Sequence, residues 1–315
     1  MDASILDSLN AATLNRRITV TLPSKGLFYD ENVVSDKLDP DDIPIRALSM
    51  LEENSLLDPL LILSGKATES VIKALVPGIK KVGSMAIIDV QAVLMASRIA
   101  TRGENYEVTV SCEKCKQEGH KSDFDVTINL LAHLAKMQPL TNDDLPFFHD
   151  KIGKLHVYFR PPIFQSVIDT AMALAKANVF DEDAPTNSEI FNEEFIQKYL
   201  NRSTVVSEVS VGYFAGYIRY LKIEDGEEVH DQETIQAWLE NAPSPVIDQI
   251  AQKVKEIDAR FEDMLTADVE CKRGHKVKVS LNLDTESLFS PAGYSKTRKN
   301  TPAGTPDTGK IESTS

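Results

Sequence analysis

Apolar and polar residues recur along the first half of the chain with the three- and four-residue spacing of amphipathic helices. This spacing predicts helical structure over Ser49–Leu63, Ala67–Val76 and Ala86–Ala100, with breaks at Asp58-Pro59 and Ser64-Gly65. The third is followed by Arg102-Gly103, a cation and then a glycine, which is the usual signal for a helix C-terminus. Two stretches rich in β-branched residues follow, and they predict strands at Tyr106–Ser111 and Phe124–Leu130 on either side of a polar hairpin tip.

The segment before these helices predicts short strands joined by turns. The first 20 or so residues have a polar, helical pattern, and Ile18–Val20 then leads into LPSKGLFYDE. Leu22-Pro23-Ser24-Lys25-Gly26 predicts a short strand running into a turn, because proline restricts the backbone and glycine permits a positive φ. A loop rich in Asp and Pro follows at 36–44, and a second short strand is expected at Ile43–Ala47.

Residues 131–265 are predicted to be mostly helical. Helices are expected at about 163–178, 189–200, 204–222 and 244–265. A hairpin-like piece, Leu155–Arg160, and an acidic loop, Asp181–Ser188, interrupt them. The pattern of Ser244–Leu265 is the strongest: Ser244 can cap this helix, Pro245 suits its first turn, and its apolar residues form one face that packs on the core of the protein or on a partner. Residues 291–315 are rich in Pro, Gly, Thr and Ser and predict a disordered tail.

The composition is that of a globular protein with an acidic surface. Of the 315 residues, 42% are hydrophobic and 26% are charged, so a sizeable core is expected. The formal net charge of −14 disfavours binding to nucleic acid. Neither a membrane span nor a signal peptide is predicted. The three cysteines are too few for a disulfide framework and indicate a reducing compartment, where thiols bind metal or lie in the core.

Two segments of the chain echo each other. Each consists of a helix, a strand ending in cysteine, a tip containing Gly-His-Lys, and a second strand. The first echo runs from Val108 through Cys112 and Gly119-His120-Lys121 to Leu130, and the second from Ala267 through Cys271 and Gly274-His275-Lys276 to Leu283. The predicted helical middle lies between the two copies.

A structural zinc site explains this echo. Tetrahedral sites take four thiolate or imidazole ligands, commonly from two knuckles. Cys112 and Cys115 supply one pair at the usual spacing, and Cys271 with His275 supplies the other, with His120 as an alternative to His275. Two other interpretations remain, metal-free reduced cysteines and a redox-active CxxC. The redox interpretation is disfavoured because the motif is expected to lead into a hairpin tip, whereas redox motifs lie at a strand-to-helix turn.

No sequence motif indicates an enzyme. Phosphate-binding loops, dinucleotide-binding glycines, HExxH and GxSxG are all missing from the sequence. The remaining histidines, His133, His149, His156 and His230, are scattered without partner spacing, and the Asp143-Asp144 and Glu227-Glu228 pairs are interpreted as solvated charge. A zinc ion with four protein ligands keeps no open position for catalysis. No small-molecule substrate is therefore expected.

Several motifs occur in an order that resembles a known family. These are the LPSKG turn, the short Ile45-Arg46 strand, the E-x-x-L helix, a helix containing Arg98-Ile99-Ala100, a tyrosine and the Cys112–Cys115 knuckle. A second knuckle with Cys271 is followed by Ser287-Leu288-Phe289. The chain thus resembles the T4-type bacteriophage baseplate protein family, with hub assembly proteins of contractile-tailed phages as functional namesakes. It departs from the family pattern in having His275 where a fourth cysteine is expected.

The patterns of the sequence themselves predict an α+β fold, mostly helical with short antiparallel strands and a split zinc-ribbon-like pair of knuckles. The resemblance implies an N-terminal extension (1–17), a zinc-knuckle module (18–130 plus 265–290), a helical insertion (131–264) and the tail (291–315). The implied function is that of a late structural or assembly protein of the tail baseplate hub. Its expected partners are other hub or tail proteins, in the host bacterial cytoplasm during assembly or in the virion. The alternative is a zinc-stapled adaptor unrelated to virions that contacts nucleic acid through lysines near the knuckles.

Overall fold

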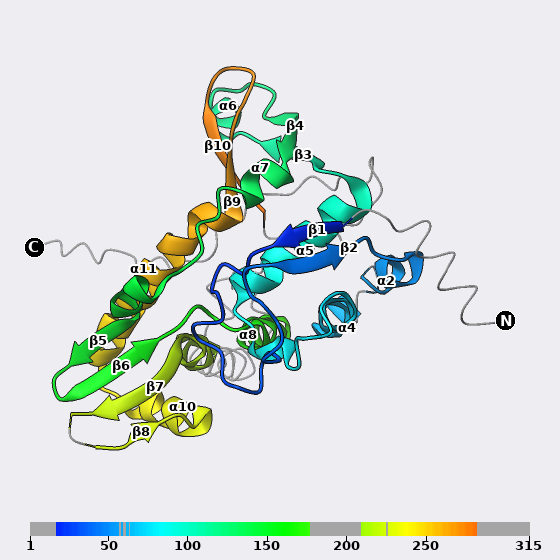
Figure 1. Cartoon of the computed structure of the whole chain (residues 1–315). Coiled ribbons are helices and arrows are strands. Elements are labelled where there is room, and N and C mark those ends of the chain that lie inside the picture. The colour runs from blue at the N-terminus through cyan, green and yellow to red at the C-terminus, as the bar shows by residue number, and fades with distance from the viewer. Residues whose placement is uncertain are drawn as a thin grey trace, which may run out of the picture.

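The computed structural model describes residues 17–281, apart from residues 57, 59–60, 63, 177–208 and 225. Its helices and short antiparallel strands confirm the predicted α+β class (Figure 1). The predictions for residues 1–16, the acidic loop 181–188, the helix 189–200, the segment 287–289 and the tail 291–315 lie outside the described residues.

The first of two hydrophobic cores is built around the helix α5 (Ile87–Arg102). Almost every residue of α5 from Ile88 to Ala100 is buried, because neighbouring elements cover it on several sides. The elements that contribute to this core include the strands β1 (Arg17–Val20) and β2 (Ile43–Arg46) and the helix α4 (Lys66–Leu75).

The ends of these helices follow the local chemistry of the sequence. The helix α2 (Met50–Ser55) begins with a capping box, in which the Ser49 side chain accepts from the backbone of Glu52 and the Glu52 carboxylate accepts from the backbone of Ser49. The helix α5 ends at Gly103, whose φ of 90° is open to glycine and strained for other residues. This end agrees with the cation–glycine signal in the sequence.

A buried carboxylate joins the LPSKG turn to the first turn of α5. Asp89 is fully buried and accepts a 2.8 Å hydrogen bond from the backbone N–H of Ser24. The hydroxyls of Ser24 and Tyr29 also donate to its side chain. Burial raises the pKa of Asp89 to about 6, although these hydrogen bonds act in the opposite direction. The turn is therefore held in place by a single side chain of α5.

Two hairpins extend the first core. The strands β3 (Asn105–Ser111) and β4 (Asp123–Asn129) pair so that Tyr106, Val108 and Val110 lie opposite Ile128, Val126 and Phe124. The strands β9 (Thr266–Glu270) and β10 (Lys276–Ser280) pair so that Val269 lies opposite Val277 and Ala267 opposite Val279. Each hairpin thus has one apolar face, and both faces pack into the first core. Figure 1 shows the hairpins together at one end of the molecule.

The second core lies under a four-stranded antiparallel sheet. The sheet has the order β5 (His149–Ile152), β6 (Leu155–Phe159), β7 (Ile218–Ile223), β8 (Glu228–Val229). The buried side chains of its inner face, such as Val157 and Leu221, share this core with residues of α10 (Gln232–Asn241) and α11 (Ser244–Leu265). Further helical elements are η1 (Val82–Ser84), α6 (Glu113–Gln117), α7 (Leu130–Leu134), η2 (Asn142–Phe148) and α8 (Phe164–Lys176).

Two predictions for the middle of the chain need correction. The helix expected at 204–222 ends at residue 217, and the chain continues directly as strand β7. Pairing with β6 on one side and β8 on the other overrides the helical spacing of the apolar residues in this stretch. The bounds of α11 match the prediction, but its N-cap is Pro243 and Ser244 provides no side-chain cap. The expected helix at 163–178 is confirmed over the described part, as α8.

Candidate metal centre

Four side chains that can ligate a metal lie at the tips of the two hairpins. Cys112 directly follows β3, and Cys115 lies in α6 (Glu113–Gln117), the short helix between β3 and β4. Cys271 directly follows β9, and His275 directly precedes β10. The tips therefore bring together Cys115 and Cys271, which are 156 positions apart in the sequence.

Backbone hydrogen bonds shape both tips. In the first, the N–H of Cys112 donates to Ser122 over 3.0 Å and the N–H of His120 donates to Cys115 over 2.8 Å. In the second, the N–H of Cys271 donates to His275 over 3.0 Å. Gly274 has a φ of 80°, which lets the second tip reverse within a few residues and turn His275 back toward Cys271.

The ligand atoms form a compact group. The Sγ atom of Cys115 lies 3.7 Å from Sγ of Cys271 and 3.5 Å from Nδ1 of His275. The Sγ atom of Cys112 lies 3.7 Å from the same nitrogen. All four ligand atoms lie within 4.8 Å of one another. The three cysteines are buried and His275 is partly buried, so the group is shielded from solvent.

These distances fit a tetrahedral metal ion. Bonds of about 2.3 Å from zinc to sulfur and about 2.0 Å to nitrogen imply edges of about 3.8 Å between two sulfurs and about 3.5 Å between sulfur and nitrogen. The observed separations of 3.7 Å and 3.5 Å agree with these edges. A disulfide needs a sulfur–sulfur distance of about 2.05 Å, so the cysteines are free thiols. The group can therefore hold a metal ion.

His275, rather than His120, joins the cysteines. His120 is exposed and lies outside the group of ligand atoms. The second ring nitrogen of His275, Nε2, lies 3.9 Å from a carboxylate oxygen of Glu118 on the opposite tip. A carboxylate beside the free nitrogen of a ligating histidine helps to fix the orientation and tautomer of the ring.

The environment of the thiols opposes a redox role. Burial, with further contributions from Cys112 and Cys271, raises the pKa of Cys115 to about 12. Burial also acts to raise the pKa of Cys271, but the backbone N–H groups of Arg273 and His275 and the neighbouring thiols outweigh it, so this pKa is lowered. Reactive CxxC motifs instead need an accessible thiol of low pKa.

The tip between Cys112 and Cys115 differs from the expected polar turn. Residues Glu113–Gln117 form a single helical turn that starts beside Cys112, in which the N–H of Lys116 donates to the carbonyl of Cys112 over 3.1 Å. The CxxC therefore lies at a strand-to-helix turn, and the prediction that it leads into a plain hairpin tip was wrong. Redox chemistry is opposed instead by the burial of the thiols.

The histidines expected to be scattered include one close pair. Nε2 of His149 lies 2.9 Å from Nδ1 of His156, because the hairpin β5–β6 places both on its outer face. Burial and the neighbouring His156 lower the pKa of His149. Alternation along β5 and β6 could have revealed this pair in the sequence, had β5 been predicted.

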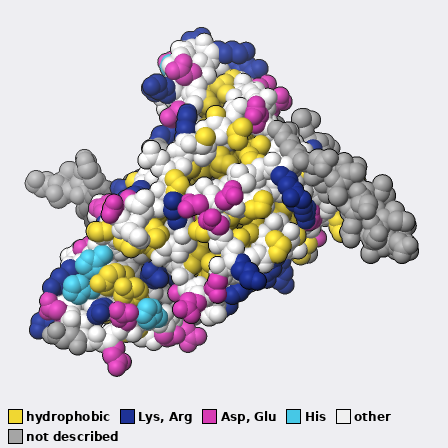
Figure 2. All heavy atoms as spheres, viewed as in Figure 1, with side chains coloured by type: hydrophobic (Ala, Val, Ile, Leu, Met, Phe, Trp, Pro, Cys, Tyr) yellow, Lys and Arg dark blue, Asp and Glu magenta, His cyan; other side chains and the backbone are white. Residues whose placement is uncertain are grey.

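His149 also begins a row of rings across the outer face of the sheet. Its ring centroid lies 4.6 Å from Tyr158, which lies 4.3 Å from Tyr220, which in turn lies 4.9 Å from His230. Figure 2 shows histidine and apolar side chains gathered on this face. The Tyr158 and Tyr220 rings are stacked, and the two histidine rings are tilted against them. The row stabilises the sheet through cross-strand contacts.

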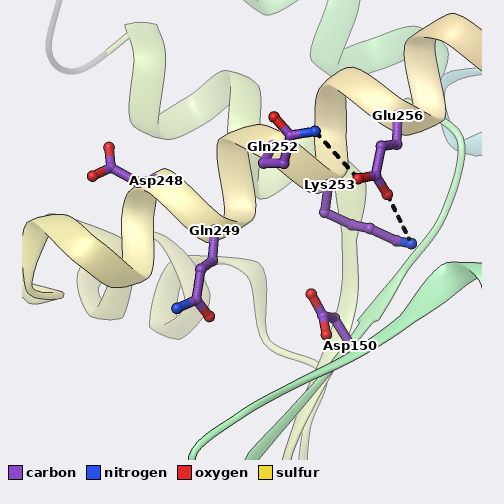
Figure 3. A pocket seen from close by; sticks show the side chains of 6 residues that line it. All are labelled: Asp150, Asp248, Gln249, Gln252, Lys253 and Glu256. Carbon is purple, nitrogen blue, oxygen red and sulfur yellow. Dashed lines mark hydrogen bonds and ion pairs between the residues drawn. The ribbon is translucent and has the colours of Figure 1, made fainter.

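An open hollow lies between β5 and α11 (Figure 3). It is lined by Asp150, Asp248, Gln249, Gln252, Lys253 and Glu256. Gln252 and Lys253 donate to the carboxylate of Glu256 over 3.2 Å and 3.3 Å, and these contacts lower its pKa. The lining includes neither a histidine nor a cysteine or serine. The hollow is instead lined by carboxylate, amide and ammonium side chains.

Comparison with known proteins identifies the family. No helix among the described residues is long and apolar enough to cross a membrane. Neither the curated proteins nor the solved structures include a significant match. The family described as T4 bacteriophage base plate protein matches residues 16–290, a span that includes both cores and all four candidate ligands. The chain therefore belongs to the T4 bacteriophage base plate protein family.

Proposed function

We propose that this protein is a non-enzymatic structural or assembly component of the phage tail baseplate hub, acting by binding other hub or tail proteins. The family match over residues 16–290 carries this proposal, because it includes nearly all of the described fold. The described residues form two hydrophobic cores and a candidate metal centre. This arrangement is consistent with a scaffold. The site of action is the host bacterial cytoplasm during assembly, and the tail baseplate if the protein stays in the virion.

We further propose that Cys112, Cys115, Cys271 and His275 hold one structural zinc ion. The match between the ligand separations and a tetrahedral ion supports zinc, as does the mixture of thiolates and imidazole. With four protein ligands the ion would have no open position, so it would stabilise the fold and take no part in catalysis. Its role is to fasten the β3–β4 hairpin to the β9–β10 hairpin.

The chain would divide its work between two parts. Residues 18–130 with 265–290 form the zinc-knuckle module that carries the family architecture. Residues 131–264 form an insertion, mostly helical but including the four-stranded sheet, that adapts the module to a particular hub partner.

A gene knockout in the phage tests the function directly. The mutant should produce heads and incomplete baseplates, but no joined contractile tails visible by electron microscopy, and expression of the protein in trans should restore plaques. Plaques at normal efficiency without complementation would refute the role. Mass spectrometry of purified virions then separates a structural subunit, whose peptides are present, from an assembly factor that leaves.

A further inference from the structure

The charges of this acidic protein are separated between its two ends. The basic tip consists of residues 112–122 and 271–276, where the two hairpins end. It carries six Lys or Arg residues and two Glu residues, whereas the rest of the chain carries 28 Lys or Arg against 46 Asp or Glu. Figure 2 shows several Lys and Arg side chains at this end of the molecule, beside a few Asp and Glu.

The lysines of the basic tip are available to a partner. All five are exposed: Lys114, Lys116, Lys121, Lys272 and Lys276. None of their side chains forms an ion pair with a described residue, and the sixth cation, Arg273, only approaches Glu118 at 3.9 Å. Within the basic tip, the group that donates a hydrogen bond to a cysteine sulfur is the backbone N–H of Arg273, which donates to Cys271. The lysine side chains are therefore not engaged at the candidate metal centre.

A segment at the opposite end of the molecule is acidic, although Lys151 and Lys222 of the neighbouring strands pair with two of its carboxylates, Glu224 and Glu228. Residues 224–248, which include β8, α10 and the start of α11, contain eight Asp or Glu and no Lys or Arg. We call this segment the acidic end; its described carboxylates are exposed, and several of them, including Glu227, Glu233 and Glu240, have no ion-pair partner among the described residues. In Figure 1, β8 and α10 lie at one end and α6 at the other, so the two regions cannot meet within one molecule.

We propose that the basic tip of one copy docks on the acidic end of a second copy. One chain supplies both complementary surfaces, and each keeps exposed charges that have no ion-pair partner among the described residues. The contact joins two different surfaces, so it is heterologous and generates a closed ring or an open chain of copies instead of a symmetric dimer. Because the pairing charges are exposed, the contact depends strongly on salt.

The same observations disfavour nucleic acid as the occupant of the basic tip. Residues 112–122 and 271–276 contain no Phe, Tyr or Trp, so the tip offers no aromatic ring on which bases could stack. The excess of acidic residues in the rest of the chain repels an extended polyanion, whereas a protein surface can contact the tip alone.

Charge reversal provides the test, with two triple variants of the full chain. The tip variant carries Lys114→Glu, Lys116→Glu and Lys272→Glu, and the end variant carries Glu227→Lys, Glu233→Lys and Glu240→Lys. Sedimentation velocity of the wild type at about 50 mM salt should show mass growing with concentration, and this growth should disappear at about 500 mM. Each variant alone should associate at least about tenfold more weakly, because the tip variant changes the formal charge of the tip from +4 to −2 and the end variant reduces that of the acidic end from −8 to −2. An equimolar mixture of the two should associate again.

A matched control separates this contact from a general effect of net charge. The variant Lys66→Glu, Lys80→Glu, Lys81→Glu changes the net charge as much as the tip variant does, at exposed positions away from both surfaces. It should associate like the wild type. A wild type that stays monomeric at low salt, a control that dissociates like the tip variant, or a mixture that does not re-associate would each overturn the proposal. Binding of duplex DNA that only the tip variant loses would assign the tip to nucleic acid instead. Circular dichroism and metal content verify that each variant is folded.

Discussion

The buried carboxylate of Asp89 should make the stability of this protein fall between pH 4 and pH 7. Asp89 has its ordinary pKa of 3.8 when the chain is unfolded and a pKa of about 6 in the folded protein. Below pH 3.8 the group is protonated in both states, and its full contribution to stability is present. As the pH rises through 6 the folded protein must ionise a buried group, so this contribution is lost.

The size of the effect follows from the two pKa values. A shift from 3.8 to about 6 corresponds to about 3 kcal/mol in the free energy of unfolding over the whole range. About 2 kcal/mol of this should be lost between pH 4 and pH 7, where measurement is practical. The loss is a large fraction of the 5–15 kcal/mol that is usual for the stability of a protein, so about 2 kcal/mol is readily measured.

The assay is urea denaturation of the wild type and of Asp89→Asn across this pH range. Asparagine has nearly the same shape and does not titrate, so the difference between the two proteins isolates Asp89 from other titrating groups. His149 and the candidate metal ligands affect both proteins alike. Circular dichroism follows the helices, and fluorescence of Trp238, the single tryptophan, follows the second core.

The expected result is a wild type that loses about 2 kcal/mol relative to Asp89→Asn as the pH rises from 4 to 7. The variant Asp143→Asn, which removes an exposed carboxylate at the start of η2, should run parallel to the wild type. If Asp89→Asn also runs parallel to the wild type, the buried carboxylate does not control this pH dependence and the reasoning fails.

Three further predictions concern the candidate metal centre and the cores. Purified protein should contain about one zinc per chain by elemental analysis, and Cys271→Ser should lose it together with solubility, whereas folded metal-free wild type would contradict the site. In chelator competition His275→Ala should weaken zinc retention and His120→Ala should not; equal retention by the two variants would remove His275 from the ligand set. In thermal or urea unfolding Phe261→Ala should cost about 3–5 kcal/mol, because this ring is 3% exposed and packs 6.2 Å from Phe148; a cost below about 1 kcal/mol would mean that the second core is not packed as described.

Periodicity predicted the elements whose own sequence carries a strong pattern. Ser244–Leu265 repeats apolar residues over six turns, and it forms a helix with those bounds. The echo of Cys112–Cys115 in Cys271–His275 predicted that two distant hairpins would meet, and their side chains do converge. In both cases the local pattern indicates what the segment must contact. An apolar helix face has to pack on a core, and two pairs of ligands at metal-binding spacing are expected to meet around one ion.

Elements that depend on distant neighbours could not be predicted as well. The stretch Ile218–Ile223 fits helical and strand spacing equally, and only pairing with β6 and β8 decides between them. A local signal was nevertheless present, since Asp225-Gly226 is a typical hairpin turn after a strand. Asp89 is similar: an acid in the first turn of an apolar helix is ordinary, and its burial becomes evident only when the Ser24 turn packs on it.

The separation of the two hairpins along the chain means that the ribosome completes the first hairpin long before it synthesises the second. The β3–β4 hairpin is complete at residue 129, but its partner hairpin β9–β10 ends at residue 280. At about 5–20 residues per second, roughly 8–30 s pass between them. During that interval the apolar side chains of β3 and β4 and the thiols of Cys112 and Cys115 lack the hairpin that packs against them in the folded protein. The nascent chain is thus most vulnerable to aggregation and to oxidation while its own middle is being synthesised, and a chaperone that acts on this protein would have its effect there.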